Sequence, residues 1–319
     1  MSNKMEVFLG IDTSNYTTSA ALCDFEGSIV TQQKIPLAVA CGQKGLRQSD
    51  AVFQHTVNLP RVMEQLFGDS EGYHIMAIGY SRTPRDTEGS YMPCFLAGEA
   101  AARSCSAALS IPAFSFSHQS GHIMAAMYSA NMTLDQNPFL AFHISGGTTD
   151  LLYVEYKDGQ FISKKIGGSL DLHAGQIIDR VGVMLGLSFP AGPALEALAA
   201  ACNTPAPKPK TCVKGSFCNL SGLENLTQGM FNAGDTPEII AAFVFVFLQK
   251  TFSEMLQHAF KQYRKMPVLF AGGVTGNRLM RPALSACCSD CAFFADPVFA
   301  SDNAAGIALL AKLKYGAAT

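Results

Sequence analysis

The sequence is short of charge, of long apolar runs and of paired cysteines, and each shortage excludes a class of protein. Only 15% of the 319 residues are charged, and the net charge is −2. The chain therefore lacks the excess of basic residues that is typical of a nucleic-acid binder. Binding of a polyanion would need a further source of positive charge. Hydrophobic residues make up 48% of the chain, which is an ordinary globular balance and excludes disorder.

No segment is long and apolar enough to predict a membrane span. The most apolar run, Ile239 to Leu248, falls far short of the roughly 20 residues that cross a bilayer. The apolar stretch Val7-Phe8-Leu9 is too short for a signal peptide. The ten cysteines are scattered through a chain far larger than a disulfide-stapled domain, which favours reduced thiols. We therefore expect a cytoplasmic protein with no membrane contact.

At 319 residues the chain exceeds the usual size of one domain, so two packed lobes with a cleft are expected. We predict an N-terminal lobe over residues 1–137 and a C-terminal lobe over 138–319, divided at Asn137-Pro138. A last helix is expected after Ser301-Asp302, and it is free to pack back on the N-terminal lobe.

A strand, a small polar tip and a second strand occur twice in the chain. The first hairpin, over residues 7–24, has the tip Thr13-Ser14-Asn15-Tyr16, and the second, over 139–156, has the tip Ser145-Gly146-Gly147-Thr148-Thr149-Asp150. Glycine and threonine let backbone N–H groups and hydroxyls approach a phosphate closely. Either tip alone is more readily an ordinary tight turn. The repetition favours a nucleotide held between two lobes.

Further patterns in the second lobe predict helices and one more strand. Residues 171–187 and 194–201 read as helices, and a long buried helix is expected to begin at Pro237. Strand Val268–Ala271 leads into Gly272-Gly273, a turn that lets the following segment carry Asn277 toward a ligand.

Two histidines have the spacing of metal ligands. His118 and His122 lie four residues apart, which places both on one face of a helix and lets them chelate a divalent ion. Metalloproteases share this spacing but need a glutamate after the first histidine, and Gln119 cannot take a proton. We therefore expect no protease activity. From spacing alone, the pair could equally be surface or cap histidines.

The histidine element occurs with five other segments in a fixed order across nearly the whole chain, and together they resemble the threonylcarbamoyladenosine synthases, once called sialoglycoprotein endopeptidases. The matching segments are Gly10–Ser14, His118–His122, Ser145–Thr149, Asp171–Gly192, Gly272–Asn277 and Asp302–Ala305. The resemblance implies an α/β, two-lobed actin-like ATPase fold (ASKHA, a duplicated RNase H-like fold) with a nucleotide cleft between the lobes.

The resemblance also implies a site and a reaction. One divalent metal, Fe or Zn, is expected on His118, His122 and Asp302, since two imidazoles and a carboxylate suit either ion. Contacts to an adenine nucleotide or to threonylcarbamoyl-adenylate are expected from Ser145, Gly146, Gly147, Asp179, Gly192 and Asn277. The threonylcarbamoyl group would pass to the exocyclic amine of the tRNA adenosine 3′ of the anticodon. The implied partners are tRNA, an adenylate-forming enzyme that supplies the donor and a paralogous dimerisation partner.

Several residues depart from the family pattern near the substrate. The loop Ser81–Gly89 is longer and more charged, Gln176 replaces a glutamate, and Glu224 replaces a lysine. Loss of that lysine weakens phosphate attraction. An alternative is thus a divergent paralogue that transfers a carbamoyl or phosphoryl group to another acceptor. A non-catalytic partner subunit is a further alternative, although a scaffold has no need of the three metal ligands.

Overall fold

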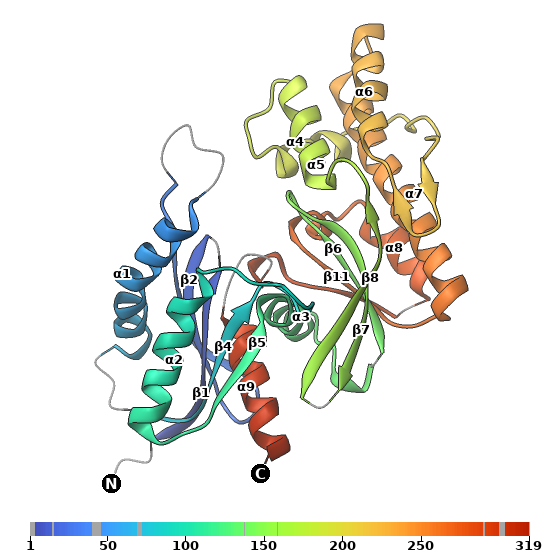
Figure 1. Ribbon diagram of the computed structural model, residues 1–319. Coiled ribbons are helices and arrows are strands. Elements are labelled where there is room, and N and C mark those ends of the chain that lie inside the picture. The colour runs from blue at the N-terminus through green and yellow to red at the C-terminus, as the bar shows by residue number, and fades with distance from the viewer. Residues whose placement is uncertain are drawn as a thin grey trace. The chain divides into compact units, whose positions relative to one another are not determined.

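The computed structural model describes residues 4–14, 16–39, 46–68, 72–136, 138–157, 159–289, 291–299 and 304–318 (Figure 1). The chain forms two compact units. The first comprises Met1–Tyr128, Tyr156–Ile162 and Ser301–Thr319, and the second comprises Ser129–Glu155 and Ser163–Ala300. The chain thus crosses between the units more than once, and the two-domain division at residues 137 and 138 stays a prediction.

The first unit contains a five-stranded sheet in the order β3-β2-β1-β4-β5. Its strands are β1 (Met5–Ser14), β2 (Thr17–Cys23), β3 (Ile29–Pro36), β4 (Tyr73–Thr83) and β5 (Ala113–Ser117). The first three are antiparallel neighbours, and β4 and β5 run parallel to β1. The predicted hairpin over 7–24 is confirmed as β1 and β2, in a register that pairs Asp12 with Ser19.

Alternate residues of β1 face helices on the two sides of the sheet. Leu9 and Ile11 join a core cluster with Leu59 of α1 (Gln48–Phe67) and Ala102 of α2 (Phe95–Leu109). Gly10 instead faces α9 (Ala305–Ala318), which also packs on β4 and β2. Because side chains alternate along a strand, Asp12 follows Gly10 to the α9 face, whereas Thr13 follows Ile11 to the α1 and α2 face.

Glycines let α9 approach its neighbours at backbone distance. A Cβ built on Gly10 would lie 2.4 Å from the backbone nitrogen of Ala308. A Cβ built on Gly306 would lie 1.9 Å from the carbonyl oxygen of Gly121, in α3 (His118–Ser129). No real side chain fits at such distances. The contact between α3 and α9 therefore requires glycine at its centre.

The second unit repeats the sheet order of the first. Its seven-stranded sheet runs β12-β11-β6-β7-β8-β10-β9. The strands are β6 (Phe139–Ile144), β7 (Thr149–Lys157), β8 (Gln160–Ser169), β9 (Val213–Lys214), β10 (Phe217–Cys218), β11 (Val268–Ala271) and β12 (Ala292–Phe294). Thus β8-β7-β6-β11-β12 matches β3-β2-β1-β4-β5 in connection and order, with β11 and β12 parallel to β6. The half-repeat predicted from the two hairpins is a duplicated topology.

The remaining elements of the second unit are helices. They are α4 (Ala174–Met184), α5 (Gly192–Ala200), α6 (Ser221–Ala233), α7 (Pro237–Tyr263) and α8 (Arg281–Cys288), with 3₁₀ turns η1 (Leu134–Gln136), η2 (Gly273–Gly276) and η3 (Pro297–Phe299). Within the described residues, α7 alone is long and apolar enough to cross a membrane, but 61% of its most apolar window is buried inside the unit. That burial is typical of a core helix.

One predicted helix begins later than expected. The pattern over 171–187 yields α4 only from Ala174. Its start is fixed by a capping box, in which the His173 backbone N–H donates to Oε1 of Gln176 at 2.9 Å. Asp171 bonds instead to the start of α6, so it cannot extend α4.

We predict that Gly306→Ala strongly destabilises the protein, because the added Cβ meets the Gly121 carbonyl oxygen rather than a flexible side chain. Overpacking of this kind costs about 3 kcal/mol, which urea unfolding followed by circular dichroism can measure. Gly316→Ala is the matched control in the same helix, since a Cβ there meets nothing within 4 Å. The control should be neutral or slightly stabilising. Equal stabilities for the two variants would contradict the packing described for α9.

Candidate functional site

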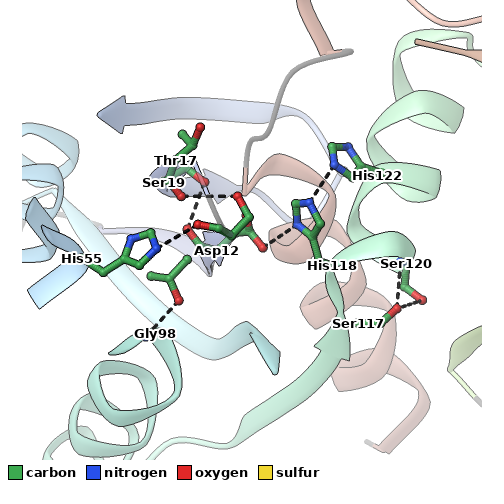
Figure 2. Close-up of polar contacts among 11 residues, drawn as sticks. Asp12, Thr17, Ser19, His55, Gly98, Ser117, His118, Ser120 and His122 are labelled. Atoms are coloured by element: carbon green, nitrogen blue, oxygen red, sulfur yellow. Dashed lines mark hydrogen bonds and ion pairs between the residues drawn. The ribbon is translucent and has the colours of Figure 1, made fainter. Parts of the chain in front are cut away.

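A buried carboxylate at the end of β1 orients the first histidine of α3. Asp12 is fully buried, and its Oδ1 accepts a hydrogen bond from Nδ1 of His118 at 2.9 Å (Figure 2). His118 follows β5 directly as the first residue of α3. Since the carboxylate is the acceptor, Nδ1 carries the proton and the lone pair of Nε2 points toward His122. This is the tautomer that a metal-binding histidine needs.

The second histidine meets the first at that lone pair. Nε2 of His122 lies 2.9 Å from Nε2 of His118, and their rings are 4.3 Å apart at 73°. Two nitrogens that bind one ion at about 2.1 Å lie roughly 3.0–3.4 Å apart, for angles between a right angle and the tetrahedral angle. The two Nε2 atoms therefore converge with nearly the spacing of ligands to a single ion.

An orphaned acceptor makes the surroundings suitable for a cation. Oδ2 of Asp12 is buried and has no hydrogen-bond partner, a costly arrangement that a nearby positive charge relieves. Among the described residues, no group of three histidine, cysteine, aspartate or glutamate side chains is placed to hold a metal. Asp302, the predicted third ligand, lies outside the described residues. The two histidines fit a metal, and the third ligand stays a prediction.

The loop that departs from the family pattern is fastened to the same helix. Oδ2 of Asp86 accepts hydrogen bonds from the hydroxyls of Ser117 at 2.6 Å and Ser120 at 2.9 Å. The backbone N–H of Gln119 donates to the carbonyl oxygen of Pro84 at 3.0 Å. A cavity of about 400 Å³ lies beside this loop, between α2 and the end of β5. The altered loop therefore shapes the surface next to the histidine pair.

The residues predicted to bind nucleotide lie in the second unit, where the tip after β6 meets the start of α4. Ser145 closes the tip by donating its backbone N–H to Thr148 at 2.8 Å and accepts from the backbone N–H of Gly175 at 3.1 Å. A Cβ on Gly175 would lie 2.7 Å from the Cα of Gly146. Gly146 and Gly147 are exposed, and a Cβ built on either meets nothing within 4 Å. The tip thus presents open backbone.

The other predicted nucleotide residues lie on the segments that follow. Oδ1 of Asp179 accepts from the backbone N–H of Ala191 at 2.8 Å, just before Gly192 begins α5. Oδ1 of Asn277 accepts from the backbone N–H groups of Leu279 and Met280, each at 3.0 Å.

A hydrogen bond and a close packing contact join the loop after β11 to α5 and to the end of β6. Glu196 of α5 accepts from the backbone N–H of Arg278 at 2.7 Å. A Cβ on Gly272 would lie 2.3 Å from the carbonyl oxygen of Ile144, so the loop after β11 packs on the end of β6. The glycine tip and Asn277 therefore lie after the carboxyl ends of β6 and β11, where open α/β sheets bind ligands, and Asp179 and Gly192 lie on the helices α4 and α5. Their roles stay predictions.

One departure from the family pattern, Glu224, and the nearby Asp171 both have structural partners. Oε2 of Glu224 pairs with Nη1 of Arg180 at 2.8 Å, so it neutralises the cation beside Asp179. Asp171 accepts hydrogen bonds from the Ser221 hydroxyl and from the backbone N–H groups of Leu172, Leu220 and Ser221. Burial alone would raise the pKa of Asp171, but these bonds outweigh it and hold the pKa far below its ordinary value.

The sequence analysis did not assign Asp12 or Asp86 to the site. The segment Gly10–Ser14 matched the family as a motif, but nothing in the spacing tells which side of β1 its carboxylate faces. Asp86 lies in the loop that departs from the family, so no motif pointed to it. Both contacts join residues far apart in the chain, and they become visible only once β1, β4 and β5 are aligned.

The fold is that of the actin-like ATPases. Component A of the Acidaminococcus fermentans (R)-2-hydroxyglutaryl-CoA dehydratase matches with a TM-score of 0.56 and 17% identity, over 97% of this chain and 99% of that chain. A ROK family glucokinase from Streptomyces griseus gives 0.53 and 11%, over 96% and 99%. HypF of T. kodakarensis gives 0.56 and 13%, over 98% and 47%. At these identities the likeness concerns the fold alone.

Within that fold, the sequence defines the family. Residues 38–309 match the model of TsaD, tRNA N6-adenosine threonylcarbamoyltransferase. The match spans most of the chain and includes both histidines and all six predicted nucleotide residues. The chain belongs to this family of tRNA-modifying transferases, and the resemblance read from the motifs is confirmed.

We predict that Asp171→Ala lowers the free energy of unfolding at neutral pH by about 1 kcal/mol, the usual cost of losing a side chain that caps a helix start. Because folding lowers the pKa of Asp171 from its ordinary value of 3.8, the carboxylate stabilises fully above that value and loses its effect as pH falls through the folded pKa. Urea unfolding at neutral pH and in steps below 3.8 should show the difference from wild type shrinking. Asp235→Ala, at the other end of α6, is the control, and a pH-independent difference would refute the assignment.

We predict that Asp12→Asn weakens the binding of Co²⁺, used as a probe of the histidine pair, by about 10- to 100-fold, the usual effect of losing a carboxylate behind a metal-binding histidine. The asparagine keeps the size of the side chain but removes its charge. Calorimetric titration measures the change, with Glu26→Gln on the exposed β2–β3 turn as the charge-matched control. Equal affinities for wild type and Asp12→Asn would show that Asp12 does not support a metal ligand.

Proposed function

We propose that the protein transfers the threonylcarbamoyl group of threonylcarbamoyl-adenylate to the exocyclic amine of the tRNA adenosine 3′ of the anticodon, in a metal-dependent reaction that releases AMP. The observation that carries the proposal is the convergence of Nε2 of His118 and Nε2 of His122 at 2.9 Å, with Asp12 bonded behind the first ring. A pair held in this tautomer is prepared for a divalent ion, and the family membership supplies the reaction class.

The proposed ligands of the ion, Fe or Zn, are His118, His122 and Asp302. When bound, the ion would supply Lewis-acid chemistry by polarising the carbamoyl carbonyl or anchoring the threonine carboxylate. Asp12 keeps the proton of His118 on Nδ1, away from the ligand atom. An aryl amine is a weak nucleophile, so the protein's main tasks are to position both substrates and to activate the carbonyl.

The nucleotide part of the donor is assigned to the second unit. The tip at Ser145, Gly146 and Gly147 is suited to the phosphate, because a Cβ built on either glycine meets nothing within 4 Å and a ligand can approach the backbone there. Asp179 is assigned to the ribose, and Gly192 and Asn277 to the segments that flank it. The Asp179 side chain also holds the start of α5, and the Asn277 side chain holds the segment that follows it, since Oδ1 of each accepts backbone N–H groups.

We include three partners in the proposal: tRNA as acceptor, an enzyme that makes the adenylate, and a paralogous dimerisation partner. A net charge of −2 gives this chain little attraction for a polyanion, so help in binding tRNA is expected from a partner. A cytoplasmic location follows from this substrate.

A second candidate is transfer to another acceptor by a divergent paralogue. It is favoured by the ion pair between Glu224 and Arg180, where the family has a lysine, and by the loop fastened through Asp86. The ion pair reduces the positive charge available to a phosphate backbone, and the fastened loop changes the surface beside the histidine pair. Such a paralogue would release AMP from the adenylate with a small amine in the absence of tRNA.

Complementation in cells depleted of their own synthase tests the proposal. Wild-type protein should restore threonylcarbamoyladenosine in tRNA, measured by mass spectrometry of nucleosides, and His118→Ala should not. His74→Ala, on the exposed part of β4, is the matched control and should restore it fully. If well-expressed wild-type protein leaves the tRNA unmodified while purified protein releases AMP with a small amine, the second candidate replaces the first.

We predict that Asp179→Asn weakens binding of an adenine nucleotide by about 1–3 kcal/mol through loss of a charge-assisted hydrogen bond. Asparagine is chosen because its carbonyl oxygen can still accept from the Ala191 backbone N–H, so α5 stays in place. Isothermal titration calorimetry measures the change, with thermal unfolding as a check on stability. Unchanged affinity would make Asp179 purely structural.

A further inference from the structure

A third histidine lies on the opposite side of β1 from the pair in α3. His55 of α1 is fully buried, and both of its ring nitrogens are bonded. Nδ1 lies 2.8 Å from the Thr18 hydroxyl, and Nε2 lies 2.8 Å from the carbonyl oxygen of Ser14 (Figure 2). Since a carbonyl only accepts, Nε2 donates and Nδ1 accepts from the hydroxyl. One neutral tautomer therefore satisfies both bonds.

These two bonds hold both strands of the β1–β2 hairpin on the face that packs against α1 and α2. Ser14 lies two residues after Asp12 on β1, and Thr18 lies beside Ser19, the cross-strand partner of Asp12. Ser19 in turn donates its hydroxyl to the carbonyl oxygen of Asp12 at 3.3 Å. His55 thus contacts both strands of the hairpin, at positions between Asp12 and the tip.

A second contact on the same face strengthens this hold. The backbone N–H of Gly98 in α2 donates to the Thr13 hydroxyl at 3.2 Å. Thr13 and Thr18 are a cross-strand pair, so both point to the α1 and α2 face, whereas Asp12 points to the α3 face. Two helices therefore fix one face of the hairpin, and Asp12 bonds to His118 on the other face.

We infer that His55 is a positioning residue: through Ser14 and Thr18 it fixes the hairpin so that Asp12 reaches Nδ1 of His118 and holds that ring in its metal-binding tautomer. Burial lowers the pKa of His55, although the bond to Ser14 and the charge of Asp12 oppose the shift. The ring therefore stays neutral in the form that makes both bonds. The inference deepens the proposed function and rests on it, but its consequence for the His118 ring can be measured without metal or tRNA.

The test reads the His118 tautomer by ¹⁵N NMR of histidine-labelled protein, in chelator and at one fixed pH. In wild type, His118 should show a protonated Nδ1 and an unprotonated Nε2. In His55→Phe, which keeps a flat ring but makes neither bond, Asp12 loses its fixed position. The His118 signals should then move toward the Nε2-protonated form that free imidazole favours. Folding of each variant is checked by circular dichroism.

Thr18→Val provides a milder variant, since it keeps the shape of the side chain and removes one of the two bonds. It should move the His118 signals in the same direction by a smaller amount. Thr251→Val is its matched control, because Thr251 is also buried and its hydroxyl bonds within α7. Val62→Ala, a buried change in α1 itself, controls for loss of stability. Neither control should change the tautomer.

A folded His55→Phe protein that keeps the wild-type His118 tautomer would overturn the inference. If His55→Phe does not fold, Thr18→Val decides, and an unchanged tautomer there has the same meaning. Failure of complementation by wild-type protein would instead refute the proposed function and leave the tautomer result standing.

Discussion

The hydrogen bond from Nδ1 of His118 to Oδ1 of Asp12 is the contact on which the candidate site depends. It joins the central strand of the first unit to the start of α3, and it decides which nitrogen of His118 carries the proton. A buried carboxylate would be costly without such a partner. With it, the charge of Asp12 fixes the ring and leaves Nε2 beside His122. The chemistry of the pair follows from that choice of tautomer.

Backbone packing brings the two residues together. The Gly121 and Gly306 contact lets α3 and α9 lie against each other, and Gly10 lets α9 lie on β1 itself. Larger residues at these positions would separate α3 from the strand that carries Asp12. Glycine is needed here for close approach, with no positive backbone angle at any of the three positions. The small residues of the motif Gly10–Ser14 thus have a packing role as well as a chemical one.

The sequence predicted local elements better than contacts between them. The two hairpins, α7 and β11 were found because alternation, glycine tips and a Thr-Pro start are local signals. The start of α4 was placed too early, because Asp171 bonds to α6 and the Gln176 side chain accepts the His173 backbone N–H at the start of α4. Helix α1 was not predicted, because it contains Pro60 and its buried face is partly polar. The role of Asp12 was missed because it depends on which face of β1 meets α3.

The same limit applies to the departures from the family pattern. Glu224 was read as a lost cation, which is correct for charge, but its partner Arg180 lies on another helix and could not be inferred. Gln176 was read as the loss of a glutamate near the substrate, whereas its side chain completes the capping box of α4. Substitutions that look like damage to a site can therefore serve the local structure that carries it.

The central claim is that His118 and His122 bind one divalent ion through their Nε2 atoms. Anomalous diffraction at the iron and zinc edges, from crystals of protein purified without chelator, tests it most directly. The account predicts one anomalous peak within bonding distance of both Nε2 atoms, and the same map will show whether Asp302 reaches it. Crystals with the two Nε2 atoms still hydrogen-bonded to each other, and no peak beside them after incubation with either metal, would contradict it.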